Sequence, residues 1–139
     1  MKQLSNKIIA SLLLILATFA ISGCTITNHN SGMIFSNKPI VGENFQNMTI
    51  LKARERVYFG IFTKKGFKDD IIQYQLLKKD EKTDVNGYKI VYSRRAEVKH
   101  EHYFTDYVVP QEAGTYYIQV FELKNLHSPI VVGVFKACD

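Results

Sequence analysis

The chain has 139 residues, which is room for one ordinary domain and not for two. Hydrophobic residues make up 46% and aromatic residues 12%, enough to bury a core, and this composition excludes a disordered chain. The formal charge of +5 is spread over short basic pairs such as Lys64-Lys65 and Arg94-Arg95, each near carboxylates. Because they form no continuous basic stripe, we expect no nucleic-acid partner.

Residues 1–23 have the layout of a signal peptide. Two lysines and no acid occupy residues 1–7, and residues 8–21 form an apolar run interrupted only by Ser11 and Thr18. An α-helix needs roughly 20 residues to cross a bilayer core, so this run is short for a permanent transmembrane anchor. The pattern predicts an exported protein.

The apolar run ends in Ile21-Ser22-Gly23-Cys24, which resembles the lipobox of bacterial lipoproteins. The resemblance implies cleavage before Cys24, diacylglycerol on its thiol and a further acyl chain, such as palmitate, on its amino group. The membrane would then be a partner through this lipid, since two or three chains anchor a protein stably where one does not. The alternative is an ordinary secretory signal that happens to end near a cysteine.

Thr25 follows the cysteine. It is not the aspartate that the resemblance to enterobacterial lipoproteins associates with retention in the inner membrane. We therefore expect an outer-membrane location facing the periplasm, or the cell surface in a single-membrane bacterium.

Residues 24–46 are rich in Asn, Ser, Gly and Thr and predict a tether with little structure of its own. Within it, Met33 to Phe35 or Pro39 to Val41 are short enough and apolar enough to dock as a first edge strand.

Residues 47–139 predict the folded domain, an all-β, immunoglobulin-like antiparallel sandwich of about seven strands. Short runs rich in β-branched and aromatic residues alternate with turn signals, such as the Asn86-Gly87 pair and Pro110. The predicted strands are Met48 to Ala53, Arg56 to Thr63, Ile71 to Lys79, Tyr88 to Ser93, Val98 to Val109, Thr115 to Leu123 and Ile130 to Ala137.

The segment from Glu112 to Ile118 resembles the pattern Asp-x-Gly-x-Tyr-x-Cys of the sixth immunoglobulin strand. The resemblance implies that Tyr116 is the corner tyrosine, with its hydroxyl bonded back to the loop that contains Glu112. Ile118 stands where the pattern has its cysteine, and the chain has no Trp. The resemblance therefore predicts an architecture and not a function.

The sequence His100-Glu101-His102 is the strongest metal-ligand pattern in the chain. Residues two apart on a strand share a face, so two imidazoles would point to one ion. A third ligand would have to come from His29, His127 or Asp106, which nothing in the sequence brings near. An exposed strand of mixed charge is the simpler interpretation.

The sequence contains no nucleophile elbow, phosphate loop or recognisable carboxylate pair, so we expect no enzyme and no cofactor. Cys138 has no neighbouring base and is interpreted as an incidental thiol. Aromatic residues from 103 to 121 suit a disulfide-free core, and Tyr103, Tyr107 and Tyr117 are the candidates for contact with a partner.

The function these features favour is a non-catalytic, membrane-anchored module that binds a protein partner at the cell envelope. The anchor would raise the effective concentration of a weak contact, and edge strands of the sandwich would be able to add a strand from the partner. The alternative is a periplasmic lipoprotein that binds a metal or small ligand through His100 and His102.

Overall fold

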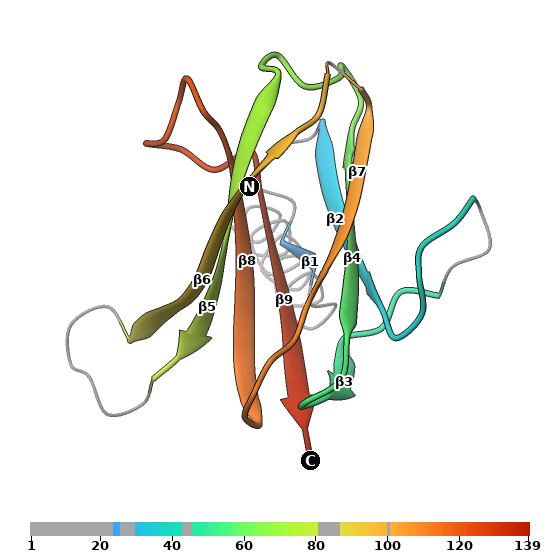
Figure 1. Ribbon diagram of the computed structural model, residues 1–139, viewed down its shortest axis with the longest axis vertical. Helices are drawn as coiled ribbons and strands as arrows, with labels where there is room; N and C mark the ends of the chain where they lie inside the picture. Colours follow the sequence, from blue (N-terminus) through green and yellow to red (C-terminus); the bar gives the residue numbers. More distant parts are fainter. Residues whose placement is uncertain (1–23, 26–29, 43–45, 81–86, 100) are drawn as a thin grey trace, which may run out of the picture.

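A computed structural model describes residues 24–25, 30–42, 46–80, 87–99 and 101–139. In these residues the chain forms nine strands and no helix (Figure 1). The strands are β1 (Cys24–Thr25), β2 (Ser31–Ser36), β3 (Ile50–Lys52), β4 (Val57–Thr63), β5 (Ile71–Lys79), β6 (Tyr88–Glu97), β7 (Tyr103–Val108), β8 (Gly114–Glu122) and β9 (Val131–Cys138).

The strands form two sheets that pack face to face. The larger sheet has the order β1-β9-β8-β5-β6, with β3 added in parallel to the end of β9, and the smaller sheet has the order β2-β4-β7. In β4, β5, β8 and β9 alternate residues are buried, as a half-buried strand requires. Phe35, Phe59, Tyr74, Tyr116 and Phe135 are the largest of the buried side chains between the sheets. The predicted all-β sandwich is thus confirmed.

The strand order is that of an immunoglobulin-like domain. A three-stranded sheet faces one in which β9, β8 and β5 are neighbours, and β6 extends the larger sheet beside β5. The β3–β9 pair is parallel, which departs from the fully antiparallel prediction. In this pair the short strand β3 lies alongside the end of β9, and Ile50 aligns with Lys136.

The predicted corner tyrosine is present. The Tyr116 hydroxyl donates a hydrogen bond to the carbonyl oxygen of Glu112 (2.8 Å), and its ring stacks on Phe135 with 5.4 Å between centroids. Both rings are buried. The corner ties the turn before β8 to the core.

All seven predicted strands have a counterpart, and β5 has the predicted bounds. The run Val98 to Val109 is wrong at its start, because β7 begins only at Tyr103. Val98 is buried, Lys99 has a φ of +48°, and the Glu101 amide donates to the Val98 carbonyl, so a turn occupies this stretch.

The tether prediction for residues 24–46 also needs correction. Residues 31–36 form β2, in which Met33 and Phe35 are buried against the core. The alternative of an edge strand at Met33 to Phe35 is confirmed, since β2 lies at the edge of the smaller sheet. Pro39 to Val41 forms no strand.

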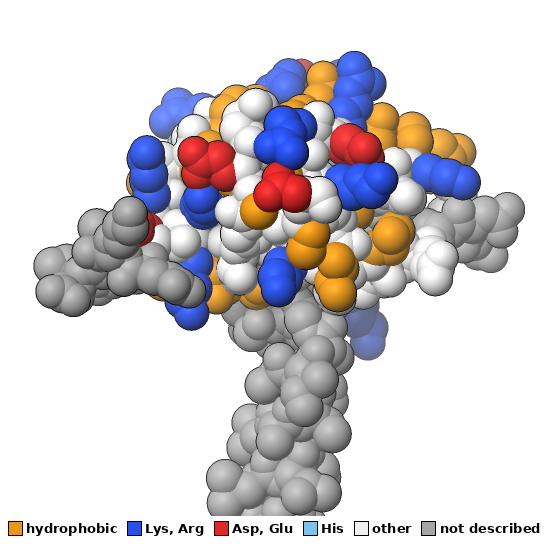
Figure 2. Space-filling model, turned by 90° about the horizontal axis from the view of Figure 1, so that it is seen from below, with side chains coloured by type: hydrophobic (Ala, Val, Ile, Leu, Met, Phe, Trp, Pro, Cys, Tyr) orange, Lys and Arg blue, Asp and Glu red, His pale blue; other side chains and the backbone are white. Residues whose placement is uncertain are grey.

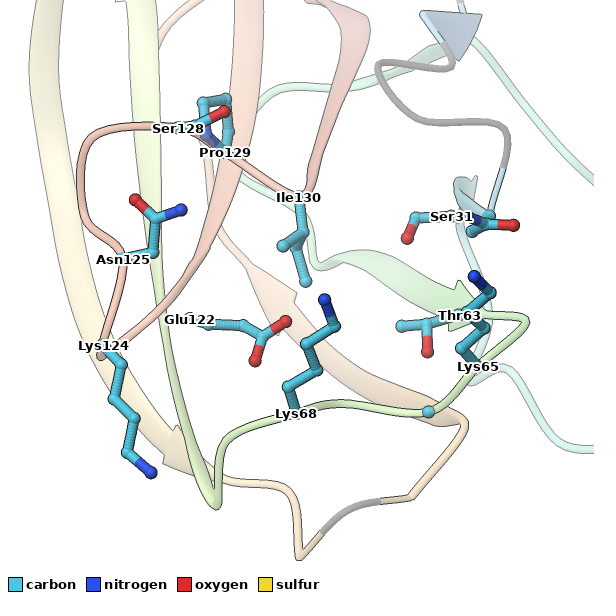
Figure 3. A pocket seen from close by; sticks show the side chains of 12 residues that line it. Ser31, Thr63, Lys65, Lys68, Glu122, Lys124, Asn125, Ser128, Pro129 and Ile130 are labelled. Atoms are coloured by element: carbon cyan, nitrogen blue, oxygen red, sulfur yellow. The ribbon is translucent and has the colours of Figure 1, made fainter.

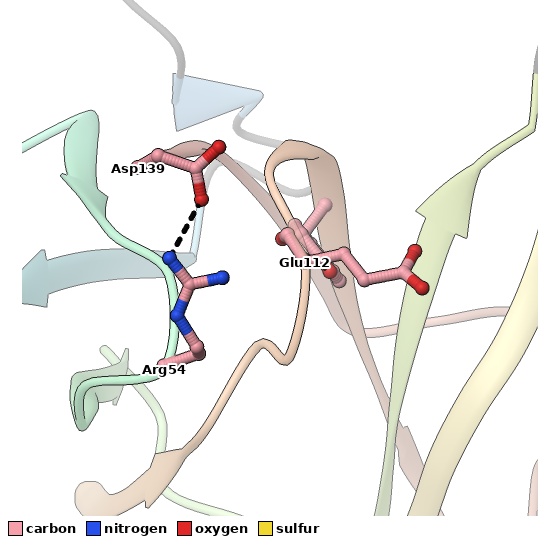
Figure 4. Close-up of polar contacts among 4 residues, drawn as sticks. Arg54, Glu112 and Asp139 are labelled. Atoms are coloured by element: carbon pink, nitrogen blue, oxygen red, sulfur yellow. Dashed lines mark hydrogen bonds and ion pairs between the residues drawn. The ribbon is translucent and has the colours of Figure 1, made fainter.

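An ion pair joins the turn between β3 and β4 to the C-terminal residue Asp139. Arg54 adopts a φ of +65°, and its guanidinium donates to the Asp139 carboxylate (2.9 Å; Figure 4). Both side chains are mostly exposed, so this ion pair contributes little to stability.

Nowhere in the described part of the chain is there a helix of the length and apolarity that crossing a membrane requires.

Candidate protein-binding face

The feature that departs most from an ordinary sandwich is strand β6. It is the last strand of the larger sheet and pairs on one side with β5. Eight of its ten residues in succession, Tyr88 to Arg95, are exposed. No described strand pairs with its other side, so β6 presents an open edge as well as both its faces.

Strand β6 is exposed on both faces because its sheet is wider than the sheet that covers it. The smaller sheet has three strands, and its edge strand β7 leaves the inner face of β6 largely uncovered. Tyr88, Ile90, Val91 and Tyr92 are consequently exposed, Ile90 to 58%. A row of large apolar side chains on an open edge is unusual, since natural proteins protect such edges.

Two other edge strands, β2 and β7, have features that oppose the addition of a further strand. At β2, the Phe35 amide donates to Asn47 Oδ1 (3.0 Å) and the Phe35 carbonyl accepts from the Met48 amide (2.8 Å). At β7, the inward-pointing Asp106 accepts a hydrogen bond from the Tyr107 amide (2.8 Å). An inward-pointing charge on an edge strand opposes addition of a further strand.

A groove of about 300 Å³ separates β6 from β7. Its walls are mostly apolar, with Val91 and Tyr92 on one side, Tyr107 and Val108 on the other, and Leu76 of β5 at its base. Arg94 also lines it. The groove places the side chains of both edge strands along one lateral side of the sandwich.

Asp106 joins the two sheets across this groove. Its Oδ2 accepts a hydrogen bond from the Tyr74 hydroxyl (2.5 Å) and lies 3.6 Å from Arg94 Nη1. Burial and the hydrogen bond to Asp106 raise the pKa of Tyr74 above its ordinary value. The phenol therefore stays protonated and serves as a permanent donor.

Basic residues dominate the exposed edge. Strand β6 carries Lys89, Arg94 and Arg95, against Glu97 at its end, and Lys78 and Lys79 lie on the neighbouring β5. Lys78 forms an ion pair with Glu112, whose pKa it holds below the usual range. Figure 2 shows that, on the end of the molecule seen from below, basic side chains are interspersed with acidic and hydrophobic ones and form no continuous stripe. On β6 the basic residues lie beside apolar side chains.

Two of the three predicted contact tyrosines, Tyr103 and Tyr107, lie on β7, the strand across the groove from β6. Tyr103 is 57% and Tyr107 40% exposed, and because they lie four residues apart on β7 they share the outer face of the smaller sheet. The Arg56 guanidinium covers the Tyr107 ring at 4.6 Å from its centroid.

Tyr117 lies elsewhere, on the outer face of the larger sheet. Its ring makes an edge-to-face contact with Tyr88 of β6, with 4.9 Å between centroids. Tyr117 is therefore adjacent to one face of β6 and separated from Tyr103 and Tyr107 by the thickness of the sandwich. The sequence pattern predicted the strand Tyr88 to Ser93 but did not predict that it lies at an open edge, although the basic pair Arg94-Arg95 following an apolar run was a usable signal.

The described residues show one member of the proposed histidine pair. His102 precedes β7 in a bend, where its Nδ1 lies 3.2 Å from the Thr63 carbonyl oxygen. His100 lies outside the described residues, so the binding of one ion by both imidazoles stays a prediction. The described residues contain no group of three or more His, Cys, Asp or Glu side chains arranged to hold a metal ion.

Cys24 lies in β1, where it aligns with Gly133 of β9. The rest of the predicted lipobox, Ile21 to Gly23, and the predicted signal peptide lie outside the described residues. Cys138 at the end of β9 is a free thiol that lines a shallow surface pocket with Ile50 and Leu51.

No protein-family model matches the chain, and no curated protein matches it. Among solved structures it is similar to the soluble domain of PmoD from Methylocystis sp. ATCC 49242 (Rockwell), with a TM-score of 0.55 and 10% identity over 83% of this chain and 96% of that one. A superoxide reductase (neelaredoxin) from Ignicoccus hospitalis has a TM-score of 0.38 and 16% identity over 66% of this chain and 71% of its own. The first likeness concerns the fold alone. The described residues form an immunoglobulin-like β-sandwich whose edge strand β6 is exposed on both faces.

Proposed function

We propose that this protein is a lipoprotein, anchored through lipid on Cys24, whose domain binds an extended acidic segment of another envelope protein along β6. The observation that carries the proposal is the open edge of β6, exposed over eight consecutive residues. The role is that of a non-catalytic binding or accessory module.

An open strand edge binds through its backbone. Unpaired N–H and C=O groups along β6 offer the main-chain hydrogen bonds of an added strand, and the flanking side chains set which segment fits. One face of β6 presents Tyr88, Ile90 and Arg95 and the other presents Tyr92 and Arg94, as the register with β5 requires. Each face therefore combines apolar contact with positive charge.

The same charges disfavour a second copy of this chain as the partner. Two β6 strands paired antiparallel about Val91 and Tyr92 would set Lys89 opposite Arg94 or Arg95. Like charges directly opposite each other destabilise a strand pair, whereas acidic side chains at these positions would stabilise it.

The position of Cys24 supports the membrane anchor in this arrangement. β1 and β6 are opposite edges of the larger sheet, four interstrand spacings or about 19 Å apart. Lipid on Cys24 would hold the β1 edge toward the bilayer and direct β6 away from it. Because Cys24 itself pairs with β9 in the larger sheet, lipid on this residue would hold the domain close to the membrane.

Binding of defined peptides to the full chain tests the edge directly. The probe is an extended peptide the length of β6, built from valine and glutamate, compared with its valine and lysine counterpart. We expect the acidic peptide to bind and the double variant Arg94→Glu/Arg95→Glu to lose about tenfold or more in affinity, since it reverses the complementary charge. The matched control Lys52→Glu/Lys136→Glu changes as much charge away from β6. Equal binding of both peptides, or loss in the control alone, would reject the proposal.

A further inference from the structure

A second, independent site lies at the end of the sandwich where β4 and β8 end and β2 and β9 begin. The loops after β4 and β8 enclose a pocket of about 450 Å³, here called the basic pocket (Figure 3). Its polar lining includes Ser31, Lys65, Lys68, Glu122 and Asn125. None of these residues belongs to β6 or to the groove beside it.

Three charged side chains point into the basic pocket. In Figure 3 the Lys65 and Lys68 ammonium groups and the Glu122 carboxylate turn toward the interior, while the Lys124 side chain leads away. Within the described residues, none of these four side chains forms an ion pair. The interior therefore holds two cationic groups against one carboxylate.

Hydrogen bonds from backbone amides join the loops that form the basic pocket. The buried Asp69 carboxylate accepts hydrogen bonds from the backbone amides of Lys124 (2.9 Å) and Asp70 (2.8 Å), which joins the two loops. The Lys64 amide donates to the Asn30 carbonyl oxygen (2.6 Å) and joins the start of β2 to them. A pocket held in this way loses less conformational entropy when it takes a ligand.

We infer that the basic pocket binds a phosphodiester that carries a hydrogen-bond donor, the chemistry of a phospholipid headgroup and of its soluble glycerol derivative. Lys65 and Lys68 hold the phosphate, and Glu122 accepts from an ammonium or hydroxyl group beside it. The carboxylate disfavours a bare anion. Asn125 and Ser31 add donors and acceptors for the remaining oxygens.

The bilayer is within reach of this end of the domain. Asn30 lines the basic pocket and follows Cys24 by six residues, which span at most about 20 Å when extended. Binding of a phospholipid headgroup therefore rests on the proposed lipid anchor at Cys24. Binding of the soluble compound does not depend on that anchor.

The first experiment titrates the full chain with sn-glycero-3-phosphoethanolamine and with inorganic phosphate at constant ionic strength, followed by the NMR shifts of residues 64–68 and 122–125. We expect saturable shifts with the phosphodiester, weaker binding of phosphate, and about tenfold or greater loss in Lys65→Gln/Lys68→Gln. The control Lys52→Gln/Lys136→Gln removes two exposed lysines elsewhere and should bind as wild type. Linear shifts without saturation, or unchanged affinity in the Lys65→Gln/Lys68→Gln variant, would overturn the inference.

The second experiment distinguishes the two sources of the ligand. Amide hydrogen exchange of residues 64–68 is measured on the full chain in nanodiscs of phosphatidylethanolamine and of phosphatidylcholine, whose quaternary ammonium has no N–H to donate. Protection in the first alone identifies the headgroup as the ligand, and protection that requires the added soluble compound identifies a soluble ligand. Absence of protection in both, with or without the compound, contradicts the inference and leaves the β6 proposal unaffected.

Discussion

The Tyr116 hydroxyl donates to the carbonyl oxygen of Glu112 across the turn that precedes β8. Because the ring is buried against Phe135, this bond fixes the turn to the core of the sandwich. The Tyr116→Phe variant keeps the stacked ring and loses only the hydrogen bond, so we expect its free energy of unfolding to fall by about 1–2 kcal/mol. Chemical denaturation measures this, and an unchanged midpoint and slope would show that the corner carries no stability.

Gly133 tests whether β2 belongs to the domain. A Cβ at Gly133 would lie 2.4 Å from Met33 Sδ and 2.6 Å from Phe35 Cζ, both on β2. We expect Gly133→Ala to destabilise the domain by about 1–3 kcal/mol, because overpacking forces side chains or backbone to move. Gly32→Ala is the matched control, since nothing lies within 4 Å of its Cβ position. Equal stability of the two variants would return residues 31–36 to the role of a tether.

Asp69 makes the stability of the domain depend on pH. Burial tends to raise its pKa, but hydrogen bonds from the backbone amides of Lys124, Ile71 and Asp70 outweigh burial and hold it below the ordinary value. The stabilisation is therefore fully present above the unfolded-state pKa of about 3.9 and is lost as the pH falls through the lower folded-state value.

Thermal unfolding from about pH 2.5 to about pH 7 measures this dependence. Asp69→Asn should be less stable than wild type at neutral pH, and the difference should shrink at acidic pH. The exposed Glu55→Gln serves as the control. A difference between Asp69→Asn and wild type that stays constant over the whole range would contradict the assignment.

Lipid on Cys24 is testable by mass and location. Wild type should gain the mass of acyl chains and float with membranes, whereas Cys24→Ala should remain unprocessed, because the thiol that accepts diacylglycerol is absent. Intact mass spectrometry and membrane fractionation of the two proteins provide the readout. Cleavage of both to soluble forms would make the protein freely secreted and would leave the domain without an anchor.

Local patterns predicted much of the fold. Strand β5 was predicted with its observed bounds, and apolar and polar residues alternate through its centre from Ile72 to Leu76. The corner at Tyr116 followed from a short motif. Strand β2 was harder to predict, because its three apolar residues lie within a Ser-rich and Asn-rich stretch and become a strand only through packing against β4 and β9.

The candidate site was less predictable, because it depends on pairing between distant strands. The run Tyr88 to Ser93 reads as an ordinary strand, and only the sheet order shows that it lies at an open edge. His100 and His102 were placed on a strand because they fall within the predicted run Val98 to Val109, whereas β7 begins only at Tyr103. The basic pocket joins loops from residues 63–68 and 122–130, a proximity that has no local signal.

We propose β6 as the binding edge of the membrane-anchored protein. Photo-crosslinking tests this most directly, with the crosslinking amino acid at Ile90 on β6, or at Lys52 on β3 as a control, in the full chain in its native membrane. We expect a discrete adduct from Ile90 that joins an acidic segment of an envelope protein, is absent from Lys52, and disappears when Arg94 and Arg95 are changed to Glu. Adducts of equal yield from both positions, or an adduct at Ile90 that survives the charge reversal, would contradict it.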